Sequence, residues 1–101
     1  MEIQKTVTGD SHEILLSGRI DGEGANRLEE EILKAIRAGA GSIYVNLSGA
    51  TFLCSAGLRV LLQYWRQMKN TQKTLLATRP SPEVDSVLGT SGFRELIVEK
   101  I

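Results

Sequence analysis

The sequence predicts a single α/β domain with a mixed five-stranded sheet, an antiparallel N-terminal edge strand and helices mainly on one face. Three observations support this fold class. Strand-like and helix-like runs follow one another in the order β-β-α-β-α-β-α-β. The first two strand-like runs are joined by Gly9-Asp10, a signal for a β-hairpin. Each later strand follows a helix, and such strand–helix–strand units place their strands in parallel through right-handed crossovers.

The first half of the chain contains the expected hairpin and one helix. Residues 3–8 are a modest strand candidate, and residues 13–20 alternate between apolar and other side chains, as a half-buried strand does. Asp21 has the character of a helix N-cap or of a turn residue before a helix. The apolar side chains of residues 24–38 recur at helical spacing, and glycines follow to end the helix.

The second half alternates short apolar runs with helical ones. Residues 42–47 are expected to form a buried central strand, and residues 56–69 show the apolar spacing of a second helix. A short strand over 74–78 follows. A third helix over 82–90 can begin at its proline, and residues 95–99, ELIVE, are expected to form the last strand.

Size and charge restrict the functions open to this chain. Its 101 residues fit one domain spanning 1–101. The 12 basic and 12 acidic side chains leave no net charge, which argues against nucleic acid or an anionic membrane as a partner. One cysteine permits no internal disulfide, and we find no signal peptide or transmembrane run, so we expect a cytoplasmic protein. The sequence contains no phosphate-binding loop or metal-ligand cluster, and no cofactor is expected.

A cluster of small residues, Cys54-Ser55-Ala56-Gly57, separates a strand-like run from a helical one. Ser55 has two interpretations. As a helix N-cap, its hydroxyl would accept a hydrogen bond from a backbone N–H further along the helix. As a modifiable or nucleophilic hydroxyl, it would lie where unpaired N–H groups and partial positive charge accommodate a phosphate. An exposed N-cap serine satisfies both interpretations.

Two other features suggest catalysis or cofactor binding. Cys54 is interpreted as a small buried side chain, with a reactive thiolate as the alternative. The one histidine, His12, lies in the hairpin and has no evident reason to lie beside Cys54 as its catalytic base. The segment GEG at 22–24 matches the first part of the glycine-rich motif that binds dinucleotides. However, Arg27 replaces the third glycine, and Glu23 would repel a pyrophosphate.

The predicted second helix carries a polar stripe of four residues, Arg59, Gln63, Arg66 and Asn70. The stripe is either a solvated face or a docking surface beside Ser55, because arginine is favoured at interfaces and is also common on surfaces. Arg59 lies four positions after Ser55 and therefore on the same side of the helix.

Three segments follow the order of a known family signature. NLSGATFLCSAGLRVLL (46–62) matches a stretch that commonly runs Asn/Asp-Leu-Ser, a spacer, Phe, a hydrophobic residue, Asp-Ser-Ser/Thr-Gly-Leu and an apolar helix. LSGRIDGEGANRL (16–28) matches an earlier Leu-Ser-Gly-x-Leu/Ile-Asp segment, and VDSVLGTSGFRELI (84–97) matches a closing helix and turn. Together, over nearly the whole chain, these segments resemble the STAS domains of bacterial anti-sigma factor antagonists.

The resemblance implies a fold that agrees with the derived order of elements, and a partner switch as the activity. In that family the unphosphorylated domain binds an anti-sigma factor, which is a serine kinase, and so frees the sigma factor. The kinase phosphorylates the domain and ends binding, and a serine phosphatase reverses the modification. By position, Ser55 is the implied phosphorylation site. With the polar stripe, the expected partner-binding residues are Cys54, Ser55, Ala56, Gly57, Arg59, Gln63 and Asp21.

We therefore expect a regulatory protein and not an enzyme, with an anti-sigma factor serine kinase and a serine phosphatase as partners, in the form of a monomer or weak dimer. Two residues depart from the signature. Cys54 stands where the family usually has Asp, and Ala56 where a second Ser or Thr is common. The missing carboxylate favours an alternative, a constitutive STAS scaffold or adaptor subunit of a large assembly or transport complex, without phosphoryl control. A small enzyme with Cys54 as its nucleophile is the third hypothesis.

Overall fold

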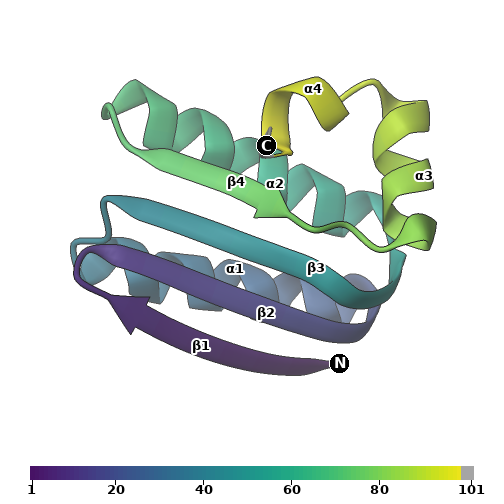
Figure 1. The fold of residues 1–101 in the computed structure, drawn as a ribbon, viewed down its shortest axis with the longest axis horizontal. Coiled ribbons are helices and arrows are strands. Elements are labelled where there is room, and N and C mark those ends of the chain that lie inside the picture. The colour runs from purple at the N-terminus through teal and green to yellow at the C-terminus, as the bar shows by residue number, and fades with distance from the viewer. Residues whose placement is uncertain (99–101) are drawn as a thin grey trace.

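The elements of the structure follow the expected order, with one exception at the C-terminal end (Figure 1). A computed structural model of the chain describes residues 1–98, apart from the side chain of Leu96. Its elements are β1 (Glu2–Thr8), β2 (Ser11–Ile20), α1 (Gly22–Arg37), β3 (Ser42–Leu53), α2 (Ser55–Asn70), β4 (Thr74–Thr78), α3 (Pro82–Ser91) and α4 (Arg94–Ile97).

The sheet has the strand order β1-β2-β3-β4. β1 and β2 pair antiparallel with Thr8 opposite Ser11, and Gly9 in the turn between them has a φ of 62°, which glycine adopts without strain. β2 pairs with β3 in parallel, and so does β3 with β4. The hairpin, the antiparallel edge strand and the parallel neighbours predicted from the sequence are therefore confirmed.

The prediction of a fifth strand over 95–99 was wrong, and the described sheet has four strands. Residues 94–97 form the short helix α4, and Val98 makes only a single parallel bridge to Ala77 of β4. Residue 99 lies outside the described residues. The apolar run favoured a strand by composition, but a short run of this kind does not distinguish strand from helix. The helical turn buries Ile97 completely, and this packing decides the conformation.

β3 is the other element that departs from its expected length, because it continues beyond 47 to Leu53. The added residues include Ser48, Gly49 and Thr51, which have the composition of a turn. They remain extended because they pair with the second half of β2, through a register shift after Leu15. Gly49 permits this close pairing, since a Cβ there would lie 2.6 Å from the Ser17 hydroxyl oxygen.

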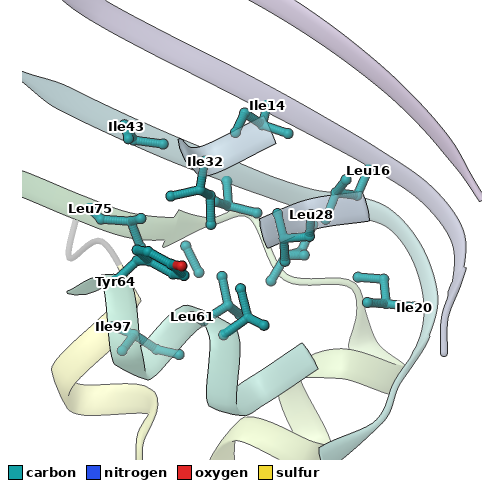
Figure 2. Close-up of a cluster of buried hydrophobic side chains, with 14 of the residues drawn as sticks. Ile14, Leu16, Ile20, Leu28, Ile32, Ile43, Leu61, Tyr64, Leu75 and Ile97 are labelled. Carbon is teal, nitrogen blue, oxygen red and sulfur yellow. The ribbon is translucent and has the colours of Figure 1, made fainter. Parts of the chain in front are cut away.

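The core lies between the sheet and the helices α1 and α2, which cover the same face of it (Figure 1). Figure 2 shows buried side chains from the sheet and from both helices pointing toward one another, among them Ile14, Ile32, Ile43 and Leu61. α3 packs against β3 and α4 against β4. The expectation of helices mainly on one face is met by the two long helices.

Within residues 1–98, the opposite face of the sheet is mostly polar, and neither α1 nor α2 covers it. It is hollowed to about 550 Å³, and the side chains around the hollow are Thr6, Thr8, Ser11, Glu13, Tyr44, Asn46, Thr78 and Arg79. All four strands contribute to this face, as expected from the alternation of side chains along a strand. The buried apolar residues of β2, β3 and β4 point to the core side, whereas Leu15 and Leu76, which alternate with them, are half-buried on the opposite face.

Candidate functional site

The candidate site is the junction between β3 and α2, where Cys54 is the N-cap of the helix. The Cys54 backbone is extended, and its Sγ accepts a hydrogen bond of 3.4 Å from the Gly57 N–H. The Cys54 carbonyl accepts the first helical bond, from Leu58 N–H at 3.1 Å. The interpretation of Ser55 as the N-cap was therefore wrong. The preference for serine at N-caps favoured it, but α2 begins at Ser55, one residue earlier than the predicted helix over 56–69.

Ser55 is the first residue of α2 and is exposed. Its hydroxyl forms no hydrogen bond with any residue in the described part of the chain. The prediction that Ser55 lies at the start of a helix with its side chain accessible is confirmed. A hydroxyl in this position can be reached by another protein, and the positive end of the helix favours a negative group on it.

Gly57 and Ala56 follow Ser55 but face differently from it. Gly57 is buried, and a Cβ added to it would lie 2.7 Å from Leu53 Cδ1 and 3.1 Å from Ile20 Cγ2. Its lack of a side chain lets the first turn of α2 pack onto the ends of two strands. The expectation that Gly57 and Ala56 contact a partner stays a prediction. In the structure Gly57 is buried and positions the helix, and Ala56 is half-buried.

Asp21 caps the neighbouring helix α1, as the sequence predicts. Its Oδ1 accepts a hydrogen bond of 2.8 Å from the Gly24 N–H, and the residue is exposed. The Cys54 N–H donates to the Ile20 carbonyl at 3.0 Å. This bond brings the starts of α1 and α2 together at the carboxyl ends of β2 and β3, so that Asp21 and Ser55 lie at the same end of the sheet.

The structure does not favour the dinucleotide interpretation of residues 22–24. The Asp21 carboxylate already occupies the Gly24 N–H, which a pyrophosphate would need. The Met1 sulfur also packs against Gly24, at 3.0 Å from where a Cβ would be. A nucleotide phosphate would have to displace both groups.

Cys54 and His12 lie at opposite ends of the sheet. His12 pairs with Ile43 near the start of β3, and Cys54 follows the end of that strand. At about 3.3 Å per residue, the stretch of β3 from Ile43 to Leu53 alone spans roughly 30 Å. His12 therefore cannot serve as a base for the Cys54 thiol. Within residues 1–98, no group of three or more His, Cys, Asp or Glu side chains is arranged to hold a metal ion.

The outer side of α2 extends the exposed surface beyond Ser55. Arg59 and Gln63 are exposed, and together with Leu62 and Arg66 they line a hollow of about 310 Å³. Of the residues expected at a partner surface, the structure thus exposes Ser55, Arg59, Gln63 and Asp21. Cys54 is half-buried.

Sequence reasoning missed one pair near the end of β3. Arg19 of β2 lies over the ring of Phe52 of β3, 4.3 Å from the ring centre, and both residues are exposed. The two are brought together by strand pairing, in which Arg19 is opposite Phe52. Their separation in sequence gives no signal of this contact; only the correct length of β3 would have revealed it.

No helix within residues 1–98 is both long and apolar enough to cross a membrane.

The chain belongs to the STAS domain family, since the family model described as "Mlab, STAS domain" matches residues 3–99. A curated relative is BtrV of Bordetella bronchiseptica, a proposed anti-sigma factor antagonist. It is 31% identical over 78 residues, which is 77% of this chain and 67% of BtrV. The resemblance drawn from the three sequence segments is therefore confirmed.

Two solved structures show the same fold. The anti-sigma factor antagonist SpoIIAA in its unphosphorylated form superposes with a TM-score of 0.83 at 25% identity, over 99% of this chain and 89% of that one. The phosphorylated form of SpoIIAA, a Bacillus cell fate determinant, gives a TM-score of 0.76 at 24% identity, over 99% of this chain and 92% of that one. The fold of this chain is thus that of an anti-sigma factor antagonist.

Proposed function

We propose that this protein is an anti-sigma factor antagonist that binds an anti-sigma factor serine kinase while Ser55 is unmodified and releases it when Ser55 is phosphorylated. The observation that carries the proposal is the exposed Ser55, with its hydroxyl unpaired, at the start of α2 beside the exposed Arg59. SpoIIAA, which has the same fold, exists in unphosphorylated and phosphorylated forms. A serine phosphatase would restore the binding form.

The switch has a simple electrostatic basis. A phosphate adds about −1.5 to −2 charges and three acceptor oxygens to a small surface. Placing that charge at the centre of an interface can cost about 2 kcal/mol or more. Such a change weakens affinity about thirtyfold. The domain does not need to refold, because the phosphate is added to a side chain that is already exposed.

The test is a calorimetric titration against an anti-sigma factor serine kinase of the same organism. We expect Ser55→Ala to bind like the unmodified chain and Ser55→Asp to bind at least about tenfold more weakly. Ser86→Asp adds the same charge at an exposed position on α3 and is the matched control. Equal affinity of Ser55→Asp and the unmodified chain would rule out the switch.

A constitutive STAS scaffold or adaptor is the second candidate, and Cys54 is the observation that favours it. Where the family usually has a carboxylate before the phosphorylated serine, this chain has a half-buried thiol. Incubation with the kinase and ATP, followed by intact mass measurement, distinguishes the two. A mass increase of one phosphate that is absent in Ser55→Ala supports the switch; an unchanged mass with retained binding supports the scaffold.

The remaining parts of the proposal concern the state in which the protein acts. We expect it to work in the cytoplasm as a monomer or weak dimer and without catalytic activity of its own. Sedimentation of the purified chain measures the first property. A hydrolase screen that compares the unmodified chain with Cys54→Ala measures the second, and an activity lost in that variant would contradict it.

A further inference from the structure

The charges of α2 are all of one sign. The helix contains Arg59, Arg66 and Lys69 and no Asp or Glu, although the whole chain carries 12 basic and 12 acidic side chains. Arg59 and Arg66 are exposed, and neither forms a salt bridge with any residue of the described chain. Lys69 lies over the ring of Trp65 at 5.0 Å. Among residues 1–98, no acidic side chain therefore forms an ion pair with Arg59 or Arg66.

These cations lie in line with Ser55. At about 100° per residue, positions 55, 59, 62, 66 and 69 fall on one stripe of the helix. Leu62, half-buried, lies between Arg59 and Arg66, and these three residues with Gln63 line the hollow of about 310 Å³. We call Arg59, Leu62, Gln63 and Arg66 the α2 surface. It combines two unpaired guanidinium groups with an apolar centre.

The chemistry of this surface indicates what would bind it. A guanidinium group pairs with a carboxylate through two parallel hydrogen bonds, which makes such pairs strong and directional. Interfaces also favour arginine around an apolar centre. A nucleic acid would gain little from Leu62, and a chain with no net charge lacks the broad basic footprint that duplex binding uses.

We propose that the α2 surface docks an acidic protein surface, with partner carboxylates on Arg59 and Arg66 and a partner apolar side chain over Leu62. This inference rests on the proposed function in taking the outer side of α2 as the docking side. It deepens that function by naming the chemistry of the partner. A phosphate on Ser55 would then add negative charge at one end of the stripe that contains Arg59 and Arg66. That charge would repel the acidic surface of the partner.

The test is photo-crosslinking in the organism that expresses the protein. A photoreactive amino acid replaces Gln63, within the α2 surface; as a control, it replaces Asn26, an exposed residue of α1. We expect capture from position 63 and not from 26, at a peptide of the captured protein that contains Asp or Glu beside an apolar residue. Arg59→Gln with Arg66→Gln should lower capture about tenfold or more. Lys73→Gln, which removes an exposed cation outside α2, should leave it unchanged.

Several results would overturn this inference. The contact peptide could be basic or neutral, or the captured species could be nucleic acid. Capture could be as strong in the double arginine variant as in the unmodified chain, or position 63 could capture nothing. Thermal melts of the variants show that they remain folded. The identity of the captured protein tests the proposed function separately. A captured protein that is not an anti-sigma factor but has an acidic contact peptide would contradict that function and leave the acidic docking surface supported.

Discussion

The phenol of Tyr64 on α2 donates a hydrogen bond of 2.8 Å to a carboxylate oxygen of Glu29 on α1. Tyr64 is buried, and its burial raises its pKa to about 12, with the bond to Glu29 as the second cause. The contact joins the two helices that cover the core face of the sheet. It therefore helps to hold α2, and the Ser55 at its start, in place.

This contact predicts an alkaline loss of stability. The folded-state pKa of Tyr64 lies above its usual value of 10.0, so the contribution of the neutral phenol is complete below pH 10 and is lost as pH rises toward about 12. Tyr64→Phe should lower the unfolding free energy by about 1 kcal/mol at pH 7 and reduce the loss above pH 10. Urea melts across this range measure both. Tyr44→Phe, on the polar face, is the control, and an unchanged alkaline loss in Tyr64→Phe would contradict the assignment.

Gly57 should tolerate no side chain. A Cβ at 2.7 Å from the buried Leu53 side chain would force the first turn of α2 away from the strands, so Gly57→Ala should destabilise the fold by about 1–3 kcal/mol. Gly22→Ala at the start of α1 is the matched control, because a Cβ there meets nothing within 4 Å. Chemical denaturation of both variants gives the comparison. If the two variants unfold at the same denaturant concentration, the close packing at Gly57 is not limiting.

Cys54 should tune the phosphorylation of Ser55 without catalysing it. Cys54→Asp restores the carboxylate that the family usually has beside its serine, so phosphorylation by a kinase of this family should become faster. It should also stabilise α2 by about 1 kcal/mol, as a better N-cap with favourable charge. Cys54→Ala should fold and bind normally, because a thiol is a weak acceptor. A phosphorylation time course of the three proteins is the measurement; no acceleration in Cys54→Asp would disprove the charge explanation.

Arg59 should pair with a phosphate on Ser55. Residues four apart on a helix are neighbours, and a guanidinium favours the dianionic form of a phosphate. Two proteins are compared, both with phosphoserine at position 55, one with Arg59 and one with Arg59→Gln. The second pKa of the phosphate should be higher in the Arg59→Gln protein. Titration followed by phosphorus NMR measures it. Arg66→Gln, two turns further along the helix, should leave the pKa unchanged, and an equal effect of both variants would show that no specific pair forms.

Local signals were enough to predict the hairpin and the helices α1, α2 and α3. Apolar periodicity indicated α1 and α2, the Gly9-Asp10 turn indicated the hairpin, and Pro82 marked the start of α3. The errors occurred where tertiary packing overrides local composition. The ELIV run of 95–98 has strand propensity, yet burial of Ile97 is achieved by a helical turn. The segment after Leu47 has turn composition, yet its pairing with β2 keeps it extended.

The candidate site was predicted in position but not in detail. Small residues between two regular elements located the junction, and Ser55 is exposed there. The identity of the N-cap depends on the residue at which β3 ends, and sequence rules determine such ends poorly. The contact between Arg19 and Phe52 depends on the register of two strands far apart in the chain. No local pattern encodes that register.

The helical turn of α4 makes the two edges of the sheet unequal in their risk of aggregation. On one side, Leu75 and Ala77 of β4 are covered, and the bridge from Val98 occupies part of that edge. A full fifth strand would have presented a new row of unpaired backbone groups there. On the other side, β1 is exposed along nearly all of its seven residues. Lys5 in that strand is tied to Glu31 at 2.7 Å, and such a charge opposes the addition of a foreign strand. The sequence thus protects one edge by covering it and the other by charge.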